Sequence, residues 1–225
     1  MAGCSREPKP QPPSLPMTST SGHGEWRALF DGRSLVAWRG YRRDRVPAGW
    51  QVVDGALTRV GQAGDLITRE VFGDFELELE WMVAEGGNSG IMYRVTEEAA
   101  ETYQTGPEMQ VLDDARHPDG GSRLTSAGSV YGLYPAPAGA VKPAGEWNAV
   151  RIVVHGNQVE HWLNGVEVAA YRLGSTDWKA RVAASKFRNW PGYGRAAAGH
   201  IALQDHGDRV AYRNIRIRTL APPER

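Results

Sequence analysis

The segment from Phe75 to Trp81 constrains the fold of this chain more than any other, because apolar and acidic residues alternate along it without a break. The apolar set is Phe75, Leu77, Leu79 and Trp81, and the acidic set is Glu76, Glu78 and Glu80. Successive side chains of a β-strand point to opposite faces, so this alternation predicts a strand with one face in a core and one polar face. Residues 108–111 alternate in the same way, with Glu108 and Gln110 on the polar side.

Short apolar segments separated by turn residues follow one another along most of the chain. Asp54-Gly55 and Asn164-Gly165 favour the positive φ angles of tight hairpin turns. The predicted strands lie within residues 50–58 (a hairpin), 66–68, 75–81, 148–154, 158–163, 166–171, 199–205 and 209–218, and we expect the last two to pair around His206-Gly207-Asp208. The pattern permits one or two helical turns in residues 97–104 and is ambiguous over 176–184. Closely spaced strands, mostly joined by hairpins, predict an all-β sandwich or barrel.

The 225 residues suffice for one domain with a full sandwich core. Residues 1–24 are rich in Pro, Ser, Thr and Lys and lack a periodic apolar face, so we expect a disordered leader or tether. The sandwich domain is predicted over residues 25–220, and residues 221–225 form a short tail.

Composition excludes several classes of partner. The 26 basic and 26 acidic residues cancel and the basic ones do not cluster, so we expect no nucleic-acid partner. No apolar run approaches the roughly 20 residues that span a bilayer, and a single cysteine rules out an internal disulfide. The chain has 8 tryptophans, a residue that either fills a core or stacks on sugar rings. Together with a polar sheet face, this composition favours a small-molecule carbohydrate as the ligand.

The lone cysteine, Cys4, follows Ala2-Gly3 and precedes a proline-rich stretch. This setting is similar to the end of a bacterial lipoprotein signal, in which the cysteine thiol is acylated. We therefore expect a lipid anchor at Cys4 as the one contact with a membrane, and a location in the bacterial periplasm or cell envelope. A chance tripeptide in a disordered leader is the alternative.

Glu108 is the first candidate for catalysis, because it follows Gly106-Pro107 inside an apolar stretch. Burial raises the pKa of a carboxyl group and suits it to general acid or base catalysis. The next residue on its strand face is Gln110, and Asp113 has the opposite parity. A conventional glycosidase needs two carboxylates about 5–5.5 Å or about 6.5–9.5 Å apart, so this strand argues against such a pair. A buried structural carboxylate is the alternative role of Glu108.

The three glutamates of the first strand are spaced about 6.6–6.8 Å apart on one face. For Glu76 and Glu78 this pattern indicates an exposed, solubilising face. Glu80 is a candidate catalytic residue, because it lies beside Trp81 and precedes the glycine-rich loop at residues 86–90.

A histidine and a lysine complete the catalytic candidates. His206 follows Gln204 on the side opposite Leu203 and titrates near neutral pH, so it serves either as acid or base or as a turn cap. Lys186 precedes a loop of glycines and aromatic residues typical of a binding rim. The substrate-binding candidates are Gln110, Gln204, Arg94, Asn88 and Trp190. The histidines lack the short spacings of metal ligands, so we predict no metal site from them.

Several short motifs recur in the order found in a known family. They are Leu29-Phe30-Asp31-Gly32, Gly73-Asp74-Phe75, Gly87-Asn88-Ser89-Gly90-Ile91, Gly106-Pro107-Glu108, Gly145-Glu146-Trp147-Asn148, Trp162-Leu163-Asn164-Gly165, Ser185-Lys186-Phe187 and Leu203-Gln204-Asp205-His206-Gly207. On these motifs the chain resembles the 3-keto-disaccharide hydrolase family from residue 26 to about residue 219. The resemblance implies an antiparallel two-sheet sandwich of the concanavalin A-like, jelly-roll type.

The resemblance also implies cleavage of glycosides whose sugar carries a ketone at C3. A base removes the acidified C2 proton, the C1 substituent leaves by elimination, and water adds to the enone. Carried over to matching positions, the functional residues are Glu80, Glu108, Gln110, Lys186, Gln204 and His206. A sugar 3-dehydrogenase would be the functional partner, no cofactor is established, and a divalent cation is left open. A non-catalytic carbohydrate-binding module and a conventional glycosidase on the same fold are the alternatives.

Overall fold

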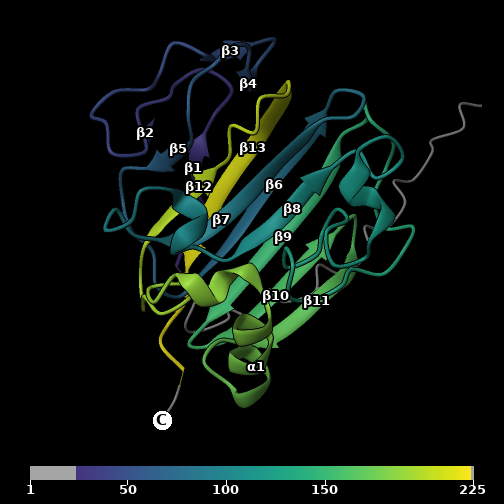
Figure 1. Ribbon diagram of the computed structural model, residues 1–225. Coiled ribbons are helices and arrows are strands. Elements are labelled where there is room, and N and C mark those ends of the chain that lie inside the picture. Colours follow the sequence, from purple (N-terminus) through teal and green to yellow (C-terminus); the bar gives the residue numbers. More distant parts are fainter. Residues whose placement is uncertain (1–23, 224–225) are drawn as a thin grey trace, which may run out of the picture.

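The computed structural model describes residues 24–223 and shows two antiparallel β-sheets packed face to face (Figure 1). The strand pattern predicted an all-β sandwich or barrel, and the family resemblance implied a concanavalin A-like two-sheet sandwich, which is thereby confirmed. The leader at residues 1–23 lies outside the described residues, and Cys4 lies outside them with it. Within residues 24–223, no helix is both long and apolar enough to span a bilayer.

The larger sheet has eight strands and the smaller has five. In spatial order the larger contains β11 (Val166–Arg172), β10 (Gln158–Leu163), β9 (Asn148–His155), β6 (Phe75–Val83), β13 (Val210–Thr219), β4 (Ala56–Arg59) and β3 (Trp50–Val53), and β1 (Arg27–Phe30) also pairs with β13. The smaller contains β2 (Trp38–Gly40), β5 (Leu66–Thr68), β12 (His200–Leu203), β7 (Asn88–Val95) and β8 (Glu108–Leu112).

The hairpins predicted at Asp54-Gly55 and Asn164-Gly165 form where the turn chemistry placed them. Strands β3 and β4 pair across Asp54-Gly55, and both of these residues adopt positive φ angles, of 50° and 77°. Strand β10 pairs with both β9 and β11, and Asn164 and Gly165 turn the chain with φ angles of 52° and 82°. Turn residues therefore determine the connectivity of this part of the larger sheet.

The predicted pairing of residues 199–205 with 209–218 is wrong, because β12 and β13 belong to different sheets. The carboxylate of Asp205 accepts hydrogen bonds from the Arg59 Nε at 2.6 Å and from the backbone N–H groups of Ala63 and Gly64 at 2.8 Å. These bonds hold the segment between β12 and β13 at the edge of the sandwich. The chain therefore crosses from the smaller sheet to the larger sheet after β12. A hairpin signal alone does not distinguish such a crossing from a tight turn.

The apolar faces of the two sheets form one core. From the smaller sheet, Met109, Val111, Ile201 and Leu203 are buried in it, as their parity predicted. The alternating apolar residues of β6 face them from the larger sheet, and Trp81 is 1% exposed. The polar partners in β8 and after β12 therefore point to the opposite, outer face of the smaller sheet.

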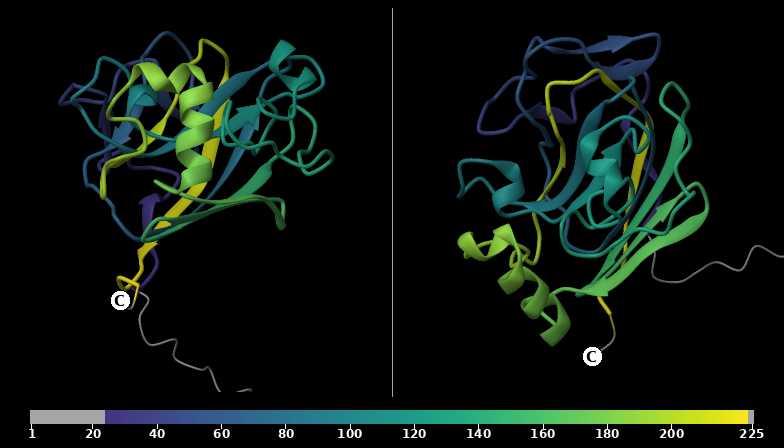
Figure 2. Two further views of the ribbon diagram at one scale, coloured as in Figure 1. Left: turned by 60° about the horizontal axis from the view of Figure 1, so that its bottom comes forward. Right: turned by 45° about the vertical axis from the view of Figure 1, so that its right-hand side comes forward.

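Helical structure is confined to the connections. The ambiguous segment forms the helix α1 (Thr176–Ala184), which begins at Ser175, whose side chain accepts a hydrogen bond from the Trp178 N–H. Three short 3₁₀ segments complete the set, namely η1 (Thr102–Gln104), η2 (Pro118–Gly121) and η3 (Lys186–Asn189). In Figure 2, α1 lies at the periphery of the sandwich.

Candidate active site

A pocket of about 160 Å³ lies on the outer face of the smaller sheet. Its lining residues are Asn88, Tyr103, Glu108, Gln110, Tyr131, Lys186, Gln204 and His206. A cavity of about 150 Å³ holds one benzene-sized ring, so this pocket has room for a single small ring. The convergence of Glu108, Gln110, Gln204 and His206 on one sheet face, which the sequence predicted, is confirmed in position.

Three neighbouring strands form the floor of the pocket. Gln110 of β8 lies opposite Gly90 of β7, and the backbone N–H of Gln204, just after β12, donates to the Gly90 carbonyl at 3.0 Å. The Ser89 hydroxyl also donates to the Gln204 carbonyl at 2.7 Å. The residues Gln110 and Gln204, each with an amide side chain, therefore lie on either side of Gly90.

Gly90 is the residue that makes room for the Glu108 carboxyl group. A Cβ atom at position 90 would collide with the Glu108 side chain along its outer half, from Cγ to Oε1. Glycine at this position therefore serves a close approach within the pocket and not a turn.

A long connection covers the free edge of β8 and brings Tyr131 into the pocket. The Tyr131 N–H donates to the Glu108 carbonyl at 3.1 Å, and the Gln110 N–H donates to the Ser129 carbonyl at 3.1 Å. The Tyr131 hydroxyl donates to Asp119 at 3.1 Å. These bonds fix the tyrosine ring beside the candidate carboxylate.

Lys186 enters the pocket from η3 and lies against aromatic rings. Its Nζ atom is 4.5 Å from the ring centroid of Tyr131 and 5.8 Å from that of Tyr103. Cation–π attraction to two rings favours a fixed position for an otherwise flexible side chain. The two tyrosines therefore hold a positive charge at the mouth of the pocket.

Glu108 is 6% exposed, and burial raises the pKa of its carboxyl group to about 8. The positive charge of Lys186 lowers this pKa and the charges of Asp65 and Asp119 raise it, both by less than burial does. At neutral pH the group therefore holds a proton that it can exchange, as the sequence predicted.

The side-chain amide of Gln110 indicates a polar ligand. Gln110 is 1% exposed, and neither its oxygen nor its nitrogen has a hydrogen-bond partner among residues 24–223. The Oδ1 atom of Asn88 is likewise buried without a partner in the described part of the chain. An unpaired buried polar group costs about 1–3 kcal/mol, so a ligand with hydroxyl or carbonyl groups would recover that free energy here.

His206 lies at the rim, with about half of its side chain exposed. Its Nδ1 atom is 3.9 Å from an Asp208 carboxylate oxygen, and its ring lies 6.2 Å from that of His117. The His117 Nδ1 in turn accepts the backbone N–H of Asp119 at 3.1 Å, which orients that ring. His206 can therefore meet a ligand at the entrance and exchange a proton there.

No group of three or more His, Cys, Asp or Glu residues suitable for a metal ion occurs within the described range. In the pocket itself, the possible ligands are Glu108, His206 and the amide oxygens of Asn88, Gln110 and Gln204. Glu108 is the only carboxylate in the described lining, and Lys186 places a positive charge beside it. This donor set fits proton transfer better than it fits a divalent cation.

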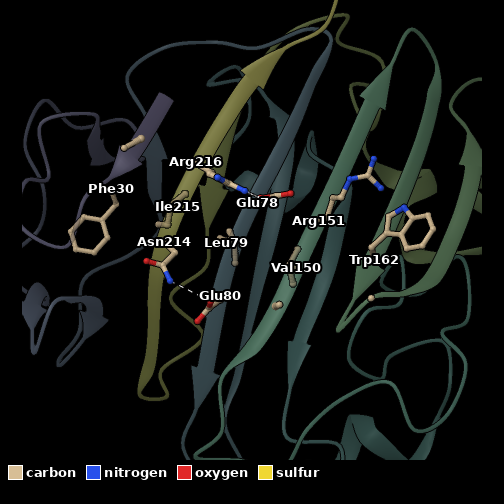
Figure 3. Close-up of a pocket in the computed structure, with 13 residues that line it drawn as sticks. Phe30, Glu78, Leu79, Glu80, Val150, Arg151, Trp162, Asn214, Ile215 and Arg216 are labelled. Carbon is tan, nitrogen blue, oxygen red and sulfur yellow. Dashed lines mark hydrogen bonds and ion pairs between the residues drawn. The ribbon is translucent and has the colours of Figure 1, made fainter. Parts of the chain in front are cut away.

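Three sequence-predicted residues lie elsewhere. Glu80 is on β6 in the other sheet, where Arg213 donates to it at 2.6 Å and Asn214 donates at 3.2 Å, so the prediction that it joins Glu108 is wrong in position (Figure 3). The physical reason is the parity of β6, which turns this glutamate to the outer face of the larger sheet.

Arg94 and Trp190 also fall outside the pocket lining. Arg94 has a φ angle of 54° near the end of β7, and its guanidinium group donates to the carbonyl of Gly156, in the turn between β9 and β10 of the larger sheet. Trp190 is half-buried and packs its ring 5.2 Å from that of Tyr103, so it supports a wall of the pocket from behind.

Sequence reasoning missed Tyr103, Tyr131 and His117. Tyr103 lies in η1, and His117 and Tyr131 lie in the long connection between β8 and β9. These connections lack apolar periodicity, and only tertiary packing brings their side chains to the site. The aromatic character of the first two was a weak signal, because tyrosine is common in both walls and cores.

Comparison with known proteins identifies the family to which the chain is similar. The family model described as the 3-keto-alpha-glucoside-1,2-lyase-like domain matches residues 25–218. A 3-keto-disaccharide hydrolase of Bacteroides thetaiotaomicron is 38% identical, over 85% of this chain and 77% of the relative. The solved structure of a candidate glycosyl hydrolase from Parabacteroides distasonis is 33% identical, with a TM-score of 0.82 over 88% of this chain and 94% of its own. A second such structure from that organism is 28% identical, with a TM-score of 0.69 over 87% and 100%.

The sandwich, the polar pocket and these relatives define a carbohydrate-active enzyme of the glycoside hydrolase type. Within that class the chain belongs to the family of 3-keto-alpha-glucoside-1,2-lyase-like domains.

Proposed function

We propose that the pocket cleaves 3-keto-glycosides by elimination followed by hydration. The observation that carries this proposal is the set of ionisable groups in the lining. Besides two tyrosines, it comprises one buried carboxyl group of raised pKa, one lysine and one histidine. Among the described lining residues there is no second carboxylate, so the pair that a conventional glycosidase needs is not formed here. The names of the family and of the Bacteroides relative support the substrate class.

The chemistry of a C3 ketone matches this set of groups. Removal of the C2 proton by a base leaves an enolate, whose negative charge develops on the ketone oxygen. When the ketone re-forms, a double bond forms between C1 and C2, the bond from C1 to the aglycone oxygen breaks, and that oxygen takes a proton from an acid. Water then adds across the double bond, with its hydroxyl on C1 and a proton on C2, and releases the 3-keto-sugar.

Each step needs a group that the pocket supplies. Glu108 and His206 exchange protons with the substrate, one as the base and the other as the acid. Lys186 lies where a positive charge would stabilise the enolate oxygen. The amides of Gln110, Gln204 and Asn88 bind the sugar hydroxyl groups and orient the ring.

The proposed substrate already carries an oxidised carbon. A reaction that oxidises the C3 hydroxyl of a glycoside to a ketone must therefore precede this one, and a sugar 3-dehydrogenase is the functional partner that we propose.

Incubation with a 3-keto-glucoside and, separately, with the unoxidised glucoside tests the proposal. We expect release of 3-keto-glucose from the first substrate and no cleavage of the second. In deuterated water, the recovered 3-keto-sugar should carry deuterium at C2, because the proton removed there is replaced from solvent. Cleavage of the unoxidised glucoside, or product without deuterium at C2, would contradict the elimination route.

A further inference from the structure

A second, larger cleft lies between α1 and the segment that follows η3. Its volume is about 720 Å³. We call it the α1 cleft, and its lining residues are Arg94, Asn157, Leu173, Gly174, Trp178, Lys179, Val182, Ala183, Arg188, Tyr193, Gly194, Arg195, Ala196 and Ala197. It shares none of these residues with the candidate active site, whose lining is a separate set. The helix α1, which contributes four of these lining residues, lies at the periphery of the sandwich (Figures 1 and 2).

The charged residues of the α1 cleft all have the same sign. Arg94, Lys179, Arg188 and Arg195 line it, and the lining includes no carboxylate. The last three are exposed, and none of them forms an ion pair within the part of the chain that the structure describes. Because the whole chain has 26 basic and 26 acidic residues, three cations without an ion pair, gathered beside Arg94 in one cleft, are a local departure from neutrality. Such a cleft attracts anions.

Arg94 adds a buried donor to this positive charge. It is 4% exposed, and its nearest carboxylate, on Asp74, is 4.0 Å away. One terminal nitrogen donates to the Gly156 carbonyl, but the Nε atom has no hydrogen-bond partner among residues 24–223. A buried guanidinium group with an unused N–H is stabilised by an acceptor, and a negatively charged acceptor gives the strongest bond.

Apolar side chains make up much of the remaining wall. Trp178 is 4% exposed and Leu173 is 3% exposed, and Val182 and Ala183 follow on the same side of α1. The Trp178 ring stacks on that of Tyr193 with centroids 5.8 Å apart and an interplanar angle of 1°. The wall is therefore rigid and suited to a flat or aliphatic body.

From the cations, the buried Arg94 and this apolar wall, we infer that the α1 cleft is a binding site for an amphipathic organic anion. The ligand class is a molecule with a ring or aliphatic body and one carboxylate, sulfate ester or phosphate ester group. The anionic group lies among the cations, and the body packs along Val182 and Ala183, which lie beside the buried Trp178. The site is separate from the proposed catalytic pocket, since η3 presents Lys186 to that pocket and Arg188 to the cleft.

The test is a fluorescence titration of the full chain with anilinonaphthalene sulfonate, an aromatic anion that becomes fluorescent in apolar sites. We expect one binding site per chain and a much weaker response to the uncharged analogue N-phenylnaphthylamine. The triple variant Lys179→Ala, Arg188→Ala, Arg195→Ala should weaken binding at least about tenfold, because each charged contact contributes. Competition by benzoate, phenyl sulfate and phenyl phosphate then identifies which anionic group the cleft prefers.

Two controls keep the test decisive. The triple variant Arg33→Ala, Arg45→Ala, Arg209→Ala removes the same charge at exposed positions outside the cleft and should leave the affinity within about twofold. Glu108→Gln, in the catalytic pocket, should not change it either. Equal weakening by both triple variants, equal binding of the uncharged analogue, or no binding at all would overturn the inference. Because no readout depends on turnover, these results are independent of the proposed function.

Discussion

Replacing Glu108 by glutamine should stabilise the fold at neutral pH while it removes proton transfer. The pKa of the Glu108 carboxyl group is about 8 in the folded protein, against its usual value of 4.5, because the group is buried. Glutamine has nearly the same shape and carries no charge at any pH. The Glu108→Gln variant therefore loses proton transfer, and it also loses the destabilisation that arises because the carboxyl group ionises more readily in the unfolded chain.

The sign and size of this effect follow from the pKa difference. A carboxyl group whose pKa is raised by folding favours the folded state most below about pH 4.5, and stability falls as pH rises from there to about 8. Each pKa unit corresponds to about 1.4 kcal/mol. By pH 7, ionisation of Glu108 in the unfolded chain therefore lowers the free energy of unfolding of the wild type by about 3 kcal/mol. At pH 5 the same ionisation destabilises the wild type by only about 1 kcal/mol. The stability advantage of Glu108→Gln should thus grow by about 2 kcal/mol between pH 5 and pH 7.

Urea denaturation followed by tryptophan fluorescence at pH 5, 6, 7 and 8 measures this advantage, and kcat on a 3-keto-glucoside should fall about 10²–10⁴-fold in the same variant. Glu97→Gln is the matched control, for which we expect a change in folding stability of the opposite sign. Arg39 lowers the pKa of Glu97 to about 2, so its ionised form stabilises the fold at neutral pH and the amide should lose stability there. An advantage of Glu108→Gln that does not change with pH would refute the buried, protonated carboxyl group, and unchanged kcat would remove Glu108 from the mechanism.

Three further substitutions test the geometry of the pocket. Lys186→Met should lower kcat about 10²–10³-fold with little change in melting temperature, since it removes a charge placed at a developing enolate, and retention of full activity would exclude that role. Glu80→Gln should leave kcat unchanged and shift the free energy of unfolding by less than about 1 kcal/mol, because a half-exposed ion pair contributes little; a large loss of activity would contradict its assignment to the other sheet. Gly90→Ala should displace the Glu108 carboxyl group and reduce kcat, measured beside melting temperature, and an active, equally stable variant would show that the close approach is not needed.

Local patterns were sufficient for much of the architecture. Alternation from Phe75 to Trp81 predicted a strand with its apolar face in the core, and Asp54-Gly55 and Asn164-Gly165 predicted hairpins that the structure contains. Parity also placed Glu108 and Gln110 together on the outer face of β8. These predictions succeed because side-chain direction in a strand and φ preference in a turn depend on neighbouring residues alone.

Which sheet a strand joins, and what lies above its polar face, depend on contacts between distant residues. Parity gave Glu80 a polar face but did not indicate which sheet that face belonged to, so it was grouped with Glu108 although the two lie in different sheets. The Asp205 carboxylate sends the chain across the sandwich through bonds to residues about 140 positions earlier, a contact that no local pattern encodes.

The sequence by itself determined most of the strands, the turns at Asp54-Gly55 and Asn164-Gly165, and which face of a strand is apolar, because each of these follows from short-range backbone chemistry. The tertiary structure decided that Tyr103 and Tyr131 flank Lys186, that Gly90 admits the Glu108 carboxyl group, and that this carboxyl group is buried enough to raise its pKa. Burial and electrostatic environment are properties of all the atoms that surround a group. They arise only when connections that are remote in sequence pack over the same face of the sheet.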